Sequence, residues 1–141
     1  MPHKILLQTL AFFLIVLSGC SCERNAEKKS IKNVAYGYSY ALGNYQVDSA
    51  DKYASEETRK TTLVTTRSLM RLVDSTYIKS DTPATIRITD IKMTSDTTAT
   101  AVWHKKTPRK KNSGTIELRK RNGEWQVYDL LKQLPARSEQ Q

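Results

Sequence analysis

Between residues 31 and 77, apolar residues recur every three or four positions, which is the period of an amphipathic helix. This spacing predicts a helix over residues 31–42, ended by the Gly43-Asn44 pair, and a shorter helical piece over 47–54. Ser55 is a suitable N-cap for a third helix that continues to about Tyr77. We therefore expect the first part of the body to be helical.

After Pro83 the pattern changes to an alternation of apolar and polar residues, which is typical of half-buried β-strands. The alternation that starts at Ile86 slips by one residue at Thr89-Asp90, which predicts a β-bulge. Asn122-Gly123 is a signal for a type I′ hairpin turn. Further strands are expected around residues 99–103, 116–118 and 125–131. Helices followed by a curved, four-stranded antiparallel sheet predict an α+β domain, placed at 31–132, with a loose tail at 133–141.

A separate apolar run, residues 5–17, follows a short basic start at the N-terminus. It is shorter than the roughly 20 residues that a membrane-spanning helix needs, so it is better interpreted as a secretory signal. The run leads into Leu17-Ser18-Gly19-Cys20, which resembles the lipobox of bacterial lipoproteins. This resemblance implies a signal peptide at 1–19, cleavage between Gly19 and Cys20, and a lipid on Cys20. An ordinary cleaved signal, with a plain thiol at Cys20, is the alternative.

The polar segment 20–30 lacks periodicity and is expected to be a flexible tether between the lipid and the domain. In bacterial lipoproteins an Asp directly after the lipidated cysteine often marks retention in the inner membrane, and here that position is Ser21. The expected location is therefore the cell envelope, with a lipid anchor in the outer membrane. With Cys20 acylated, Cys22 has no cysteine partner within the chain.

A second resemblance concerns the body of the chain. Residues 40–45 (YALGNY), 50–54 (ADKYA) and 122–127 (NGEWQV) are similar to small bacterial lipoproteins of unknown function with a nuclear-transport-factor-2-like (NTF2-like) fold. The likeness covers roughly residues 31–132. It implies a cone in which a bent sheet wraps a long helix and leaves a pocket.

The sequence lacks the usual signatures of catalysis and cofactor binding, such as the P-loop, G-x-G-x-x-G, H-E-x-x-H and G-x-S-x-G motifs. After signal removal one histidine, His104, remains, and the strand pattern places it opposite Trp103, facing solvent. We therefore expect no cofactor and no metal site. Asp129 is a weak catalytic candidate, because the alternation through Trp125 places it inward, where burial raises a carboxyl pKa. The alternative is that the strand ends near Tyr128 and that Asp129 caps it or faces water.

Four large side chains either fill the core or line a pocket: Tyr38, Met70, Trp103 and Trp125. The chain is basic, with a net charge of +9, or +8 once Lys4 leaves with the signal. Five residues in a predicted long hairpin loop carry much of this excess: Lys105, Lys106, Arg109, Lys110 and Lys111. The loop is either simply solvated or contacts anionic lipid head groups or acidic polysaccharide. Nucleic acid is disfavoured by the compartment.

Three Asp-Ser/Thr triplets resemble an O-glycosylation sequon of some envelope bacteria, with Ser49, Ser75 and Thr97 as acceptors, although a Ser/Thr-rich chain also produces such matches by chance. Taken together, the sequence predicts a membrane-anchored envelope lipoprotein with a non-catalytic domain that binds a partner protein, an envelope polymer or an apolar ligand. The alternative is a small-pocket enzyme of the isomerase or dehydratase type that uses Asp129.

Overall fold

The computed structural model describes residues 3–129, with side chains from residue 22 onward. Contacts divide the chain into two compact units that meet between Ser30 and Ile31. Helix α1 (His3–Gly43) begins in the first unit and ends in the second. Residues 20–30, expected above to be a flexible tether, are helical in the structure. Their Glu, Lys, Arg and Ala residues favour helix, and no Gly or Pro interrupts them.

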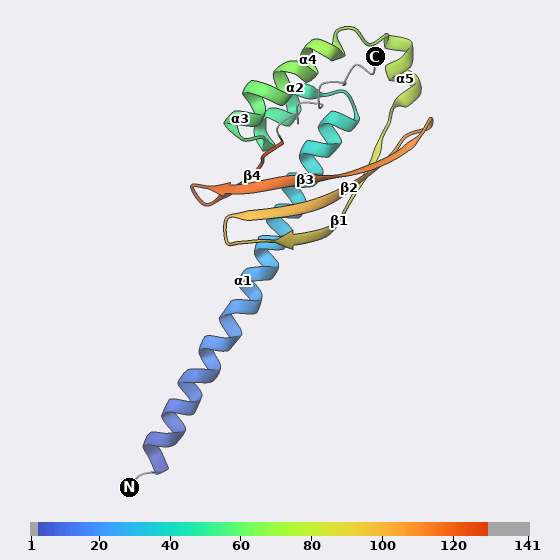
Figure 1. Cartoon of the computed structure of the whole chain (residues 1–141). Helices are drawn as coiled ribbons and strands as arrows, with labels where there is room; N and C mark the ends of the chain where they lie inside the picture. Colours follow the sequence, from blue (N-terminus) through green and yellow to red (C-terminus); the bar gives the residue numbers. More distant parts are fainter. Residues whose placement is uncertain (1–2, 130–141) are drawn as a thin grey trace, which may run out of the picture. The chain divides into compact units, whose positions relative to one another are not determined.

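The second unit contains all the other elements (Figure 1). Its helices and helical turns are α2 (Val47–Ala50), η1 (Asp51–Tyr53), α3 (Glu56–Thr58), the π-helical turn η2 (Arg59–Leu63), α4 (Val64–Met70) and α5 (Ser75–Asp81). Its strands are β1 (Thr85–Met93), β2 (Thr98–Lys106), β3 (Lys111–Arg121) and β4 (Glu124–Val127).

Helix α1 ends at Gly43 as predicted, but the residue in the left-handed conformation is Tyr45 (φ 62°), not Gly43 or Asn44. The Gln46 N–H donates to the Ala41 carbonyl at 2.8 Å, which closes a Schellman-type turn. Gly43 instead serves packing, because a Cβ there would lie 3.0 Å from Ile86 Cδ1 and that side chain would have to move slightly. The glycine therefore lets α1 approach the sheet.

The predicted N-cap is confirmed: Ser55 Oγ accepts from the Thr58 N–H at 3.2 Å. The prediction that this helix continues to Tyr77 is wrong, because α4 ends at Met70 and α5 begins afresh at Ser75. Asp74 caps α5 by accepting from the Thr76 N–H at 2.7 Å. An Asp side chain that bonds its own following backbone favours a helix start over a helix interior.

The sheet is an antiparallel meander in the order β1-β2-β3-β4. The register of β1 against β2 shifts between Thr89 and Lys92, with Asp90 at φ 49°, so the predicted bulge is confirmed. The hairpin turn is also confirmed, with Asn122 and Gly123 at φ 52° and 82°. The last strand ends at Val127, shorter than predicted, and Leu131 and the tail lie outside the described residues.

The prediction of a long loop between β2 and β3 is wrong. The two strands pair as far as Lys106 and Lys111, and the Thr107 N–H closes a tight turn on the Lys110 carbonyl at 2.9 Å. Strand alternation continues to the turn. Lys105 lies inward and pairs there with the buried carboxylate of Asp81.

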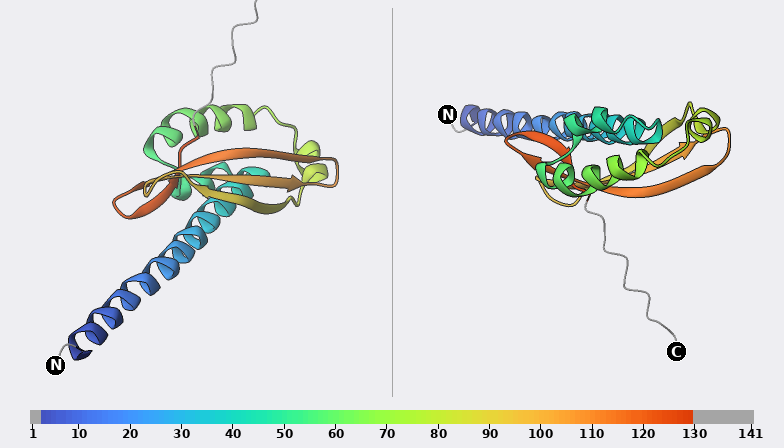
Figure 2. Two further views of the ribbon diagram at one scale, coloured as in Figure 1. Left: turned by 60° about the horizontal axis from the view of Figure 1, so that its bottom comes forward. Right: turned by 90° about the horizontal axis from the view of Figure 1, so that it is seen from above.

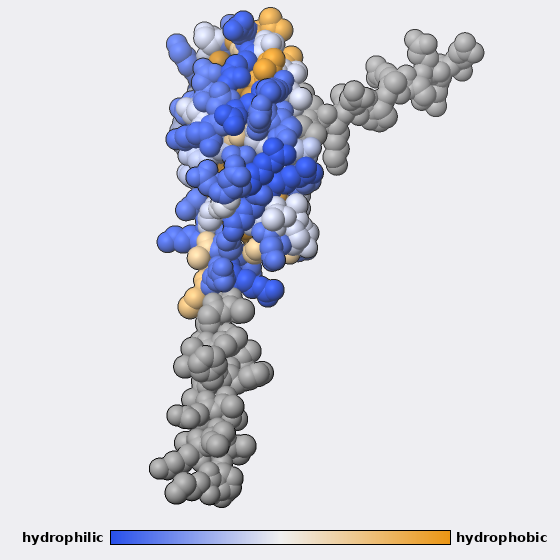
Figure 3. Space-filling model, turned by 90° about the vertical axis from the view of Figure 1, so that its left-hand side faces the viewer, coloured by the Kyte–Doolittle hydropathy of each residue, from blue (hydrophilic) through white to orange (hydrophobic). Residues whose placement is uncertain are grey.

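The helices of this unit cover one face of the curved sheet (Figure 2). Inward side chains from all four strands are buried there, among them Ile86 on β1 and Val127 on β4, and they form one core with Ala35, Tyr38 and Leu63. A parallel bridge between Ala54 and Val127 ties the helical segment to the last strand. The face of the domain in Figure 3 is mainly hydrophilic, with a few hydrophobic residues near its top.

Candidate functional site

A cavity of about 260 Å³ lies between α1 and the concave face of the sheet. Apolar walls come from Leu42 on α1, Ile86 on β1, Trp103 on β2 and Ile116 on β3. Polar groups also reach it: the Tyr38, Ser39, Lys105, Asn112 and Asp129 side chains belong to the lining residues. An apolar space with a few convergent polar groups is the usual form of a small-molecule site.

Tyr38 and Asp129, separated by 91 residues in the sequence, meet at this cavity. The Tyr38 hydroxyl donates to Asp129 Oδ2 at 3.3 Å. Burial raises the pKa of Tyr38, and the negative charge of Asp129 and the hydrogen bond to it raise that pKa further. Tyr38 is therefore a neutral hydrogen-bond donor throughout the physiological pH range.

The helical segment fixes the backbone of Asp129. Its N–H donates to Thr58 Oγ1 at 2.9 Å, and its carbonyl accepts a short hydrogen bond from the Thr62 hydroxyl. Thr58 Oγ1 also donates to the Val127 carbonyl at 3.0 Å. Thr58 immediately precedes the π-helical turn η2 and Thr62 lies within it, so this irregular turn holds the backbone of Asp129 in place. Asp129 thus lines the cavity, but β4 ends at Val127, as the alternative expected, so contacts with Thr58 and Thr62 place it there rather than strand alternation.

Trp103 lies across a glycine of the neighbouring strand. It pairs with Gly114, where a Cβ would lie 2.8 Å from Trp103 Cζ2. The missing side chain lets the indole lie flat against β3 and form one wall of the cavity. Of the four pocket candidates, Tyr38 and Trp103 line the cavity, whereas Trp125 is a core residue and Met70 packs against the core.

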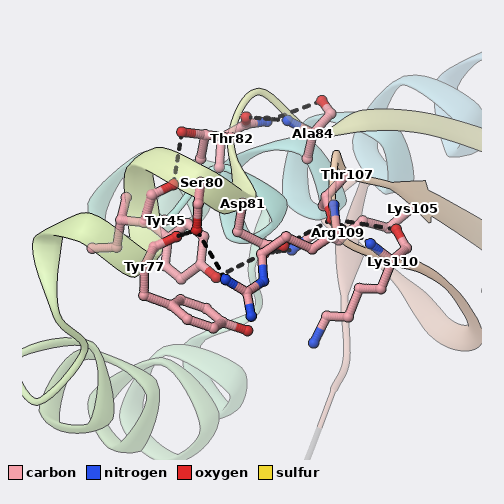
Figure 4. A network of polar contacts seen from close by, with 12 residues as sticks. Tyr45, Tyr77, Ser80, Asp81, Thr82, Ala84, Lys105, Thr107, Arg109 and Lys110 are labelled. Carbon is pink, nitrogen blue, oxygen red and sulfur yellow. Dashed lines mark hydrogen bonds and ion pairs between the residues drawn. The ribbon is translucent and has the colours of Figure 1, made fainter.

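A buried carboxylate that no sequence pattern indicated, Asp81 at the end of α5, connects that helix to Tyr45 and to the β2–β3 hairpin (Figure 4). Asp81 is fully buried, and it accepts from the Tyr45 hydroxyl and from Thr107 Oγ1, both at 2.8 Å. Lys105 Nζ lies 3.4 Å from Asp81 Oδ2. Burial alone would raise the pKa of Asp81, but the bonds from Thr107 and Tyr45 and the Lys105 charge outweigh it and lower that pKa.

This network changes the interpretation of the basic residues. Lys105 faces Asp81, and Arg109 lies over the Tyr77 ring at 4.7 Å and donates to Ser80 at 3.2 Å. Lys106 and Lys111 line a surface groove of about 390 Å³. Arg87, His104 and Lys105 also belong to its lining. Lys110 is exposed in the turn.

The remaining candidates are dispersed. His104 is exposed, as predicted, and its Nε2 lies 2.9 Å from Thr89 Oγ1. Ser49, Ser75 and Thr97 are all exposed. Cys22 is exposed and free, whereas the side chain of Cys20 lies outside the described part of the chain.

Two findings concern the described residues alone. Among them, no group of three or more His, Cys, Asp or Glu side chains is arranged to hold a metal ion. No helix within the same residues combines the length and apolar character needed to cross a membrane.

The sequence matches no protein-family model and no curated protein. The structure is similar to the crystal structure of an NTF-2-like protein of unknown function from Shewanella oneidensis MR-1. The TM-score is 0.50 at 17% identity, over 70% of this chain and 92% of that one. At this identity the likeness concerns the fold. The chain therefore carries an α+β domain with the NTF2-like fold that the sequence resemblance implied.

Proposed function

We propose that the domain is a binding module whose cavity takes a small, mainly apolar ligand with one hydrogen-bond donor. The single observation that carries this proposal is the cavity itself, with apolar walls and the Tyr38–Asp129 pair. An engineered cavity of about 150 Å³ holds benzene, so a cavity of about 260 Å³ accommodates roughly ten non-hydrogen atoms. Six-membered rings with one polar substituent are therefore suitable test ligands.

Fluorescence of Trp103 provides the test. Cyclohexylamine and cyclohexanol fit the cavity and do not absorb where tryptophan is excited, so each is titrated against the full chain. We expect both to shift the emission, and we expect Asp129→Asn to weaken the amine about tenfold while changing the alcohol less, because the amine alone carries a charge. Trp103→Phe is the control, since Trp125 lies in the core. No response to either compound would refute the proposal.

The Tyr38–Asp129 pair also supports a second candidate, an isomerase- or dehydratase-type enzyme. Asp129 would remove a proton from carbon next to a ketone, and the electron pair would move onto the ketone oxygen. Tyr38 would then turn from Asp129 to donate to that oxygen. Cyclohexanone in D₂O tests this candidate. If the protein is such an enzyme, the wild type exchanges the α-hydrogens of the ketone faster than Asp129→Asn does. Equal rates would contradict the enzyme and leave binding as the proposed function.

We further propose that a lipid on Cys20 anchors the protein to a membrane of the cell envelope, namely the outer membrane. The lipobox resemblance supports this proposal. Two or more acyl chains at about 0.8 kcal/mol per buried CH₂ make such anchoring stable. Growth with radioactive palmitate should label the wild type and Cys22→Ala but not Cys20→Ala, and labelling of Cys20→Ala would contradict the anchor.

The basic groove is the part of the surface we propose for anionic partners, either lipid head groups or acidic polysaccharide. Its support is the gathering of the positive charges of Arg87, Lys106 and Lys111 around one hollow. Near an anionic membrane each basic residue contributes about 1 kcal/mol. Cosedimentation with phosphatidylglycerol vesicles and with alginate beads, each at rising salt, distinguishes the two sources. Binding to neither refutes the proposal.

A further inference from the structure

A second hollow, of about 440 Å³, lies on the surface of the same unit, between α1 and the α2–η1 segment. None of the residues that line it also lines the interior cavity. A ligand in this hollow would therefore be independent of the ligand proposed for the cavity, so an experiment that refutes one proposal does not refute the other.

The main feature of this groove is an aromatic platform. Tyr36 and Tyr40, one helical turn apart on α1, stack with their ring centroids 5.7 Å apart and their planes at 25°. They are 45% and 40% exposed, so together they place a large aromatic area at the surface of the groove. Exposed tyrosines that are held rigid by each other are typical of binding surfaces, because little side-chain freedom is lost on contact.

Tyr53 forms a second aromatic surface of the groove. Its ring lies directly against α1 at Gly37, where a Cβ would be 2.2 Å from Tyr53 Cζ. Glycine in a helix interior costs about 1 kcal/mol relative to alanine. At Gly37 the packing of the Tyr53 ring against the helix offsets this cost. Lys52 Nζ lies 4.9 Å from the centre of the Tyr53 ring.

The polar residues of the groove define the chemistry of its ligand. Asn33 and Gln46 present exposed side-chain amides, and neither amide makes a hydrogen bond to the described part of the chain. Among the described residues, no acidic side chain lines the groove, and Lys52 adds a positive charge. An aromatic cage for a cationic ligand would be disfavoured by that charge.

We propose that this groove binds a glycan, with a sugar ring stacked on the Tyr36–Tyr40 platform. A pyranose ring exposes polarised C–H groups on one face, which contact the electron-rich face of an aromatic ring. Its hydroxyls both donate and accept, as the Asn33 and Gln46 amides do. Lys52 favours sugars that carry carboxylates over neutral ones.

Saturation-transfer NMR tests the proposal on the full chain in sugar-free detergent micelles. The probes are tetra-N-acetylchitotetraose, which is neutral, and tetragalacturonate, which is acidic. We expect saturation to pass from the protein to the sugar C–H groups of at least one probe, with a stronger signal for the acidic one. The double variant Tyr36→Ala/Tyr40→Ala should weaken binding about tenfold or more, because both rings of the platform are lost.

Matched variants separate the platform from general effects. Tyr36→Phe keeps the ring and should keep binding, and Lys52→Gln should weaken the acidic probe but not the neutral one. Leu72→Ala changes a side chain that is 82% exposed elsewhere on the surface and should change nothing. Circular dichroism confirms that each variant is folded. Absence of transfer to both probes in the wild type, or unchanged binding in the double tyrosine variant, would overturn the proposal.

Discussion

Replacing Asp81 by alanine should destabilise the domain more than any other single change at an acidic residue. The carboxylate is fully buried and receives bonds from Tyr45 and Thr107 at 2.8 Å, with Lys105 at 3.4 Å. Removing one member of a buried charged network costs roughly 3–5 kcal/mol. The Lys105 side chain is 16% exposed and regains some water, so we expect the lower end, about 3 kcal/mol.

Urea denaturation followed by circular dichroism measures this loss. A free-energy change of about 3 kcal/mol corresponds to a Tm lowered by roughly 15 °C in a domain of this size. Asp96→Ala, at an exposed acidic position, is the matched control and should stay within about 0.5 kcal/mol of the wild type. A loss below 1 kcal/mol in Asp81→Ala would refute the reasoning.

The same carboxylate gives the domain an acid limit. The pKa of Asp81 is lower in the folded state than its ordinary value of 3.8, because the Thr107 and Tyr45 bonds and the Lys105 charge outweigh burial. Its contribution is therefore present above about pH 4 and is lost as the pH falls through the folded pKa. Asp81→Asn should be less stable at pH 7 but should lose less stability on acidification, and an unchanged acid limb would contradict this.

Three further changes have defined outcomes. Burial, together with the hydrogen bond and charge of Asp81, raises the pKa of Tyr45 to about 12, so its contribution is lost as the pH rises from about 10 towards that value. Tyr45→Phe should flatten the alkaline limb of the stability profile, and an unchanged limb would argue against the pairing. Gly114→Ala should push the Trp103 indole out of place, shift its emission and weaken cyclohexylamine, and retained emission and affinity would show that the ring does not depend on the glycine. Ser55→Ala should cost about 1–2 kcal/mol in urea denaturation, and a loss within error would mean that the cap is dispensable.

The elements that could be predicted from the sequence are those set by local chemistry. Alternation placed the strands, the one-residue slip placed the bulge, and Asn122-Gly123 placed the turn, because each depends on neighbouring residues. The helix that was predicted to continue to Tyr77 failed for the opposite reason. The apolar spacing continued through Asp74, but the Asp74 side chain bonds to the backbone after it and starts a new helix.

The candidate site was predictable in its parts but not as a whole. Helical spacing placed Tyr38 inward, but Asp129 lies beyond the end of β4, and no local pattern shows that the two meet across 91 residues. The Asp81 network escaped for a similar reason. Asp81 lies in a polar stretch that reads as a loop, and tertiary contacts with Tyr45, Lys105 and Thr107 determine its burial.

If the space between α1 and the sheet is a ligand site, filling that space should abolish binding. Ser39 lines the cavity and is 8% exposed, so Ser39→Leu replaces its hydroxyl with apolar bulk inside the cavity. The cyclohexylamine titration is repeated on this variant, with Trp103 emission as the readout. We predict that binding is abolished while the thermal stability of the free protein is kept or raised. Undiminished binding in a folded Ser39→Leu protein would contradict the claim.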